Sequence, residues 1–312
     1  MKPMLATAAQ TLPIGEQWSY EFKWDGVRAL IDIRERGPKI FSRAENDITA
    51  AYPELSNAAA ACPDALLDGE IVAFVDGHPS FDALQTRMHV RDRAEALRLA
   101  AETPVSFVVF DVLRCDGVDV TTRPLSERRQ LLTDWIARDV ETTAWLTPSP
   151  VFADGPATEA AARQHGLEGV VAKRISSKYR PGQRSADWHK LRFVRTGDFV
   201  VIGWEAPAEG SRELSSVVLA YYVDGALTYA GKAGSGLTGP VARKLQASLT
   251  TREDCPLDEA PPASPGRSVT WVEPAVVVEI EFHTWTDDGR LRHPVFRRIR
   301  TDKLASEAAG DA

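Results

Sequence analysis

The sequence predicts an α+β domain, built of antiparallel sheets with helices, followed by a small β-barrel domain of the OB type. Two observations support this prediction. The chain has 312 residues, which exceeds the usual size of one domain. Its character also changes near residue 195, from strands mixed with helices to short strands. We therefore predict a first domain over residues 1–195, a barrel over residues 199–304 and a disordered tail over residues 305–312.

The first domain begins with an aromatic strand. In residues 18–24 (WSYEFKW) the four aromatic residues alternate with polar ones, which is the period of a strand with one buried face. Further strands are predicted over residues 29–33, 66–75, 105–112 and 169–174. Helical patterns cover residues 81–101, 125–137 and 158–165, the last of them ended by Gly166.

The second domain is predicted to consist mainly of short strands. They cover residues 199–204, 217–223, 227–230 and 276–285. The Asp224-Gly225 pair between two alternating segments is a strong hairpin signal. One helix is predicted over residues 237–249 and a loop over residues 256–265. About five strands with a single helix are typical of an OB barrel.

Composition excludes several classes of protein. The apolar runs are too short to span a bilayer, and the N-terminus lacks the apolar core of a signal peptide, so we expect a cytoplasmic protein without a membrane partner. Cys62, Cys115 and Cys255 are scattered singly, which fits neither a disulfide framework nor a zinc site.

The charge is unevenly distributed along the chain. The net charge of -7 argues weakly against binding to nucleic acid, but local basic surfaces decide whether phosphates are neutralised. Two stretches, residues 173–195 and 290–303, are strongly basic, with one opposing acid in the first and Asp302 in the second. They are interpreted either as phosphate-binding surfaces or as solvated faces.

One lysine stands where a strand ends. Lys23 is followed by Asp25, Gly26 and Arg28, in the form KxDGxR. By itself this pattern is as compatible with a solvated lysine on an amphipathic strand as with a reactive one. Four further segments follow in order: LDGEIV at residues 67–72, VVFD at 108–111, EGVVAK at 168–173 and WHKLR at 188–192. Ser42-Arg43 lies after the first segment, and RTDK at residues 300–303 closes the array.

This array resembles the covalent nucleotidyltransferase superfamily, which contains ATP-dependent DNA ligases, RNA ligases and mRNA-capping enzymes. EGVVAK and the closing FHTWTDDGRLRHPVFRRIRTDK look most like the ligase module of bacterial end-joining DNA ligases. The resemblance implies an ATP-grasp-like nucleotidyltransferase domain followed by an OB domain. It also implies an enzyme of DNA repair and recombination that uses ATP and Mg²⁺ (or Mn²⁺), acts at the nucleoid and is a monomer.

The chemistry of Lys23 can be argued from the residue types. A lysine amine that attacks the α-phosphate of ATP forms a phosphoramidate and divides a difficult transfer into easier steps. Supplying the neutral amine at pH 7 costs about 4.6 kcal/mol, given an ordinary pKa near 10.4. Neighbouring cations would lower that pKa and stabilise the transferring phosphoryl group.

By resemblance, Lys23 is the residue that becomes adenylylated. The resemblance also implies ATP contacts from the following residues: Glu21 near adenine, Arg28 and Arg43 at the ribose and nick phosphate, Glu70 at the ribose or metal, Phe110 stacked on adenine, and Lys173, Arg184, Lys190, Arg300 and Lys303 at the phosphates. Glu70 and Glu168 are the implied metal ligands, and Asp25, Arg43, Arg174 and Arg192 the implied DNA contacts. The family often has a second lysine where this chain has Arg192, so the role of Arg192 is open.

Alternatives remain for several residues and for the function. Phe110 could be a plain core residue, and Glu21 a surface acid. We expect Arg300 and Lys303 to act when the barrel closes over ATP, with a hinge near residues 195–198. An mRNA-capping guanylyltransferase or an RNA ligase is the alternative enzyme, and a non-catalytic OB-type nucleic-acid-binding protein the alternative of another class. The DNA partner is a nicked or broken duplex, with a DNA end-bridging protein as a further partner.

Overall fold

The computed structural model describes residues 1–139, 145–207, 213–261, 263–286 and 288–310. The chain divides into two compact units, Met1–Phe193 and Val194–Ala312. Each unit has its own hydrophobic core. Within the described ranges, no helix has the length and apolar character needed to cross a membrane.

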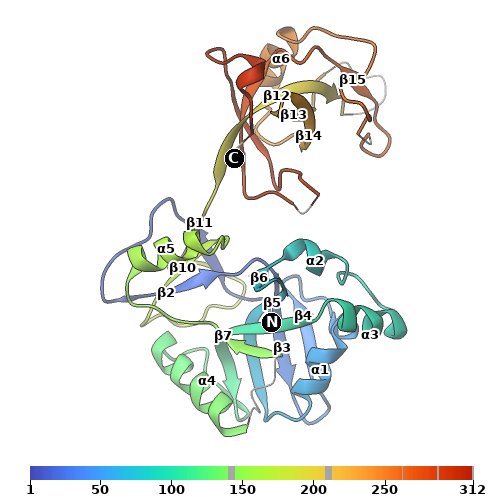
Figure 1. Cartoon of the computed structure of the whole chain (residues 1–312). Coiled ribbons are helices and arrows are strands. Elements are labelled where there is room, and N and C mark those ends of the chain that lie inside the picture. Colours follow the sequence, from blue (N-terminus) through green and yellow to red (C-terminus); the bar gives the residue numbers. More distant parts are fainter. Residues whose placement is uncertain (140–144, 208–212, 262, 287, 311–312) are drawn as a thin grey trace. The chain divides into compact units, whose positions relative to one another are not determined.

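The first unit contains a seven-stranded sheet covered by helices. Its strands are β4 (Lys39–Ser42), β3 (Val27–Ile33), β5 (Ala65–Val75), β7 (Val105–Cys115) and β8 (Val118–Asp119), with β6 (His78–Pro79) on β5 and β9 (Leu146–Pro148) on β7. Figure 1 shows the helices α1 (Pro53–Ala59), α3 (Arg93–Glu102) and α4 (Leu125–Asp139) around this sheet. Phe107 of β7 and Trp135 of α4 are fully buried in the core between them.

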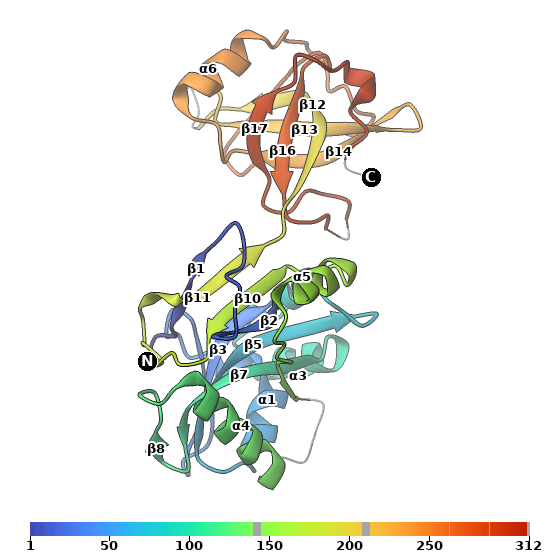
Figure 2. The ribbon, with the colours of Figure 1, turned by 90° about the vertical axis from the view of Figure 1, so that its left-hand side faces the viewer.

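A second sheet of the same unit carries the aromatic strand. Its order is β1 (Leu5–Ala8), β11 (Arg184–Arg192), β10 (Gly169–Arg174) and β2 (Trp18–Lys23), side by side in Figure 2. Helix α5 (Gly155–Gln164) packs against it; a Cβ atom at Gly155 would lie 2.8 Å from the Tyr20 ring. Between the two sheets lies a smaller apolar cluster that includes Leu30, Phe110 and Trp188.

The second unit is a β-rich, OB-like domain. One path of its sheet runs β14 (Ala226–Ala233), β13 (Ser216–Val223), β12 (Arg195–Glu205), β16 (Val277–Phe282) and β17 (Val295–Ile299), with β15 (Val269–Trp271) paired to β12. Helix α6 (Gly239–Ala247) contributes Leu245 to the core. Asp224 and Gly225 form the β13–β14 turn with φ angles of 49° and 84°, as the hairpin signal predicted.

Four features differ from the sequence-based expectations. The predicted helix over residues 81–101 is two helices, α2 (Phe81–Gln85) and α3, and His89 between them has a φ of 69°. Helix α1 and strands β1, β4, β6, β8, β9, β11, β15 and β17 were not predicted. Residues 195–198 are hydrogen-bonded to β16 as part of β12. Instead of a disordered tail, residues 305–310 form a short 3₁₀ turn (Ala305–Glu307) followed by a fully buried Ala308; residues 311–312 lie outside the described ranges.

Candidate active site

Lys23 lies at the C-terminal end of β2, opposite Gly169 of β10. Its Nζ forms a short ion pair with Glu168, the residue before β10. Two glycines near Lys23 allow neighbouring backbones to approach closely. A Cβ atom at Gly26 would lie 2.2 Å from the Ile71 backbone oxygen, and a Cβ atom at Gly169 would lie 2.0 Å from the Leu191 backbone oxygen. The glycines of the KxDG and EG motifs therefore serve the close approach of strands around Lys23.

A second carboxylate faces Lys23 from β5. Burial raises the pKa of Glu70 to about 7, while the charges of Lys23 and Arg28 act in the opposite direction and that of Glu168 adds to the rise. Glu70 pairs in register with Arg28 of β3. Glu70 on β5 and Glu168 just before β10 thus approach the amine from two different sheets.

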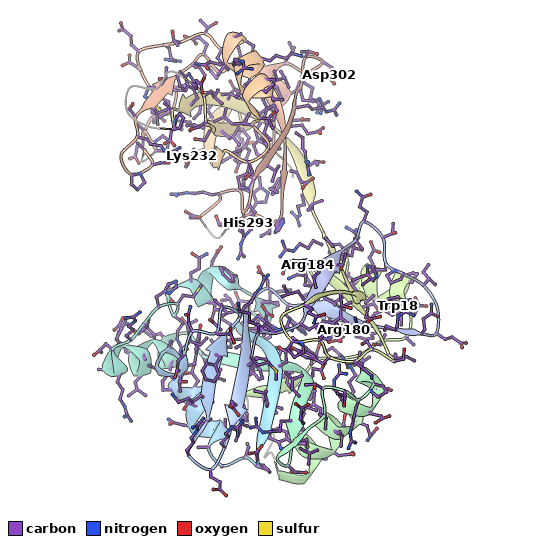
Figure 3. The ribbon with its side chains drawn as sticks, turned by 180° about the vertical axis from the view of Figure 1, so that it is seen from behind. Trp18, Arg180, Arg184, Lys232, His293 and Asp302 are labelled. Atoms are coloured by element: carbon purple, nitrogen blue, oxygen red, sulfur yellow. The ribbon has the colours of Figure 1, made fainter. Side chains whose placement is uncertain are left out.

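Cations gather around the same point. Burial lowers the pKa of Lys190 below its ordinary value, and the charges of Arg192, Lys23, Arg184 and Arg43 lower it further. Arg192 Nε also lies 3.0 Å from the second oxygen of Glu168. Arg184 is exposed on β11, at the surface of the first unit in Figure 3. This cluster of positive charge suits the polyphosphate of a nucleotide.

Glu21 and Lys173 form a separate group further along the sheet. Lys173 pairs in register with Ser19, four residues along β2 from Lys23. Its Nζ lies 2.7 Å from Glu21, which is 2% exposed and also paired with Arg129 of α4. Burial alone raises the pKa of the Glu21 carboxyl, but Arg129 and Lys173 bring it below the ordinary value. Burial lowers the pKa of Lys173 to about 8. Glu21 is therefore not a surface acid.

Phe110 lies beside this second group. It is 7% exposed; the Arg28 guanidinium lies 4.4 Å and Lys173 Nζ 4.1 Å from its ring centroid. Arg28 donates two hydrogen bonds, of 2.6 and 2.7 Å, to the fully buried Asp68. The Tyr179 hydroxyl donates to the same carboxylate at 2.6 Å. The polar surroundings distinguish Phe110 from a purely apolar core residue.

The site residues predicted from the sequence therefore fall into three groups. Lys23, Glu70, Glu168 and the cations at 43, 184, 190 and 192 form the first group, and Glu21, Phe110 and Lys173 the second. Arg28 pairs in register with Glu70 and lies over the Phe110 ring. Arg300 and Lys303 belong to the second unit. Arg174 forms an ion pair with Asp187, and its guanidinium lies 4.6 Å from the Trp18 ring centroid. Asp25 also has an interaction partner within the protein.

Sequence reasoning missed three residues of the site. These are Arg129, Asp68 and Tyr179, each of which orients a predicted residue. Asp68 lies inside the LDGE segment, so the motif itself could have indicated it. Arg129 carries no local signal, because it resembles any arginine of an amphipathic helix.

The donor set next to Lys23 fits a hard divalent cation. Carboxylate oxygens are the ligands that Mg²⁺ prefers, and Mg²⁺ is commonly held by one or two carboxylates together with substrate phosphates. Within the part of the chain that the structure describes, no three His, Cys, Asp or Glu side chains form a metal-binding group. Glu70 and Glu168 are thus suited to share a metal with a bound phosphate.

Comparison with known proteins agrees with this geometry. The sequence profile of the ATP dependent DNA ligase domain matches residues 3–192, and that of the ATP dependent DNA ligase C terminal region matches residues 210–303. The chain belongs to the ATP-dependent DNA ligases. Its first unit is the nucleotidyltransferase domain of this family, and its second the OB-like domain.

Two relatives and one solved structure show what the chain is similar to. It is 35% identical to the multifunctional non-homologous end joining DNA repair protein LigD of Mycobacterium tuberculosis, over 98% of this chain and 39% of the relative. It is 31% identical to DNA ligase C of the same species, over 97% of this chain and 90% of the relative. A structure of mycobacterial DNA ligase D complexed with ATP and MES matches with a TM-score of 0.57 and 34% identity, over 99% of this chain and 98% of that one. The chain thus spans about two fifths of the multifunctional relative.

Proposed function

We propose that this chain seals breaks in duplex DNA through a covalent lysyl-AMP intermediate on Lys23. The Lys23 nitrogen forms a bond to the α-phosphorus of ATP, the bond to pyrophosphate breaks, and the amine loses its proton. AMP then passes to the 5′-phosphate of the nick, and the 3′-hydroxyl displaces AMP to form the phosphodiester. The observation that carries the proposal is Lys23 between Glu168 and Glu70, ringed by cations, in a chain of the ligase family.

The two groups of side chains suggest how ATP lies along the sheet. Because Lys23 must reach the α-phosphate, the phosphates of ATP would be bound by Lys190, Arg184 and Arg43. The base then lies toward Glu21 and Phe110. Lys173 belongs with the base rather than with the phosphates, because it pairs with Glu21 and lies over Phe110, four residues from the level of Lys23. This revises the phosphate role implied for Lys173 by the resemblance.

Glu70 and Glu168 would hold Mg²⁺ or Mn²⁺ when it is bound. The metal supplies charge that stabilises the transferring phosphoryl group. Before that, the carboxylate of Glu168 holds the Lys23 amine at the end of β2, and Arg192 holds the other oxygen of the same carboxylate. We therefore infer that Arg192 binds Glu168 in the free protein and contacts DNA only when the nick is bound.

Nicked or broken duplex DNA is the proposed macromolecular substrate. Asp25 would place the nick end, and Arg43, Arg174 and Arg192 would contact the backbone. The relative LigD is named for non-homologous end joining, which supports broken ends as substrates and an end-bridging protein as a partner.

A sealing assay tests the proposal. Nicked duplexes with DNA or RNA at the 3′ side are incubated with ATP or with GTP, and both the sealed strand and the covalent protein–nucleotide adduct are measured. We expect sealing of DNA with ATP and Mg²⁺. Adduct formation with GTP alone would indicate a guanylyltransferase, and absence of any adduct would indicate a binding protein.

A further inference from the structure

A carboxylate of the second unit holds two cations that are distant in the sequence. Asp198 of β12 is mostly buried, with 12% of its side chain exposed. Arg300 Nη1 lies 2.8 and 3.0 Å from its two oxygens. Lys303 Nζ lies 2.5 Å from the second of them. The first and last members of the RTDK motif therefore meet on one acid, 102 and 105 residues earlier in the chain.

Further contacts fix the orientation of Arg300. Its Nε and Nη2 donate to the two oxygens of Asp302 at 2.9 and 2.8 Å, and Glu279 lies 3.6 Å away. Asp302 is exposed and marks this surface of the second unit in Figure 3. Only 14% of the Arg300 side chain is exposed, whereas Arg297 of β17 is 48% exposed and bonds to Glu281.

The backbone holds Asp198 itself in place from two sides. It pairs with Glu279 in the β12–β16 ladder, and an isolated bridge joins it to Gly310. Two cations drawn to one carboxylate repel each other, and the repulsion is strong where water is scarce. Asp198 offsets that repulsion. Without it, nothing among the described contacts would keep Lys303 beside Arg300.

We propose that Asp198 is a positioning residue, which presets Arg300 and Lys303 as one pair for the pyrophosphate end of ATP. The inference rests on the proposed function, the adenylylation of Lys23, together with the expectation that this pair acts when the barrel closes over ATP. Asp198 would touch neither ATP nor DNA. Its contribution would be preorganisation, because a cation pair that is already oriented loses less freedom when the phosphates bind.

Charge and orientation predict opposite results for Asp198→Asn. The substitution removes one negative charge near bound ATP, which by charge alone would strengthen ATP binding. Loss of the preset pair would instead weaken it. We expect the KM for ATP in single-turnover adenylylation to rise about tenfold, the effect of losing one hydrogen bond between charged groups. Sealing of a nick that already carries AMP, with ATP omitted, should keep its rate.

Two control variants make the test specific. Glu281→Gln removes an acid of the same strand as Glu279 that pairs with Arg297, and it should leave the KM for ATP unchanged. Asp198→Glu keeps the charge and should recover part of the loss. Acetylation of Lys303, followed by mass spectrometry of the full chain without ATP, should become faster in Asp198→Asn because the ion pair is gone.

The failure of this inference and that of the proposed function can be told apart. If Arg300→Ala with Lys303→Ala adenylylates Lys23 normally, the proposed role of the pair is wrong, whatever Asp198 does. If that double variant is crippled but Asp198→Asn has an unchanged or lower KM, the positioning inference is overturned. Equal loss in adenylylation and in sealing of the adenylylated nick would also overturn it, since it would indicate a general structural role.

Discussion

Lys173 lies buried beside Glu21, and replacing it by methionine should change how stability depends on pH. Burial lowers the pKa of Lys173 to about 8 in the folded protein, from an ordinary 10.5. Below pH 8 both the folded and the unfolded chain carry the proton. Between pH 8 and 10.5 the folded chain has lost it while the unfolded chain retains it, so unfolding takes up a proton and stability rises with pH. The shift of about 2.5 units corresponds to about 3 kcal/mol.

Lys173→Met should lack this rise. We would measure urea unfolding of the full chain from pH 7 to pH 10.5 for wild type and variant, because the difference between them cancels the groups that titrate in both. Wild type should gain about 3 kcal/mol over the variant across that range, at about 1.4 kcal/mol per pH unit. Parallel curves would refute the reasoning, and would mean that Lys173 titrates in the folded protein as it does in the unfolded chain.

Three further predictions concern the metal ligand, the strand contact and the DNA. Glu168→Ala should impair the metal-dependent steps far more than nick binding, measured side by side; normal adenylylation with lost binding would contradict the metal assignment. Gly169→Ala should lower the free energy of unfolding by about 3 kcal/mol in thermal denaturation, because its Cβ would lie 2.0 Å from a backbone oxygen. The helical Gly239→Ala, whose Cβ would meet only Arg243 Nη1 at 3.5 Å, should be tolerated, and equal losses would argue against the strand contact. Nick affinity should fall with salt with a log–log slope of about -5, if about six phosphates are neutralised, and a slope near zero would exclude both basic stretches from the DNA.

The centre of the candidate site could be predicted because its signals are local. Lys23 ends a strand with clear alternation, and glycines mark the places where backbones must approach closely. Lys23 and Glu168 meet because β2 pairs with β10 in the four-stranded sheet, whereas Glu70 comes from β5 of the seven-stranded sheet. The change from mixed structure to short strands was equally visible, because hydrophobic periodicity reports on each segment separately.

The remaining features depend on partners far away in the sequence. Arg129 meets Glu21 across 108 residues, and Arg300 meets Asp198 across 102, so no local pattern indicates either pair. The second basic stretch illustrates the same limit. Its arginines at 290, 297, 298 and 300 are all paired with acids of the second unit, which a count of charges along the chain does not reveal. The pairs of Arg290, Arg297 and Arg298 are exposed and therefore weak, so these three arginines remain candidates for DNA contact.

The observed strand boundaries change the position of the proposed hinge in the sequence. Motion at residues 195–198 would break the ladder between β12 and β16. Phe193 and Val194, between β11 and β12, belong to neither strand and span the boundary of the two units. We therefore place the hinge of the proposed closure there.

The central claim is that Lys23 takes up AMP from ATP. The direct test is to incubate the full chain with ATP and Mg²⁺, measure its intact mass, and locate any adduct by peptide mapping. We predict a gain of one AMP, attached to Lys23, and no gain in Lys23→Ala, whose truncation on a polar strand face should leave the fold intact. A stable AMP adduct on Lys23→Ala, or an adduct mapped to another residue of the wild type, would contradict the account.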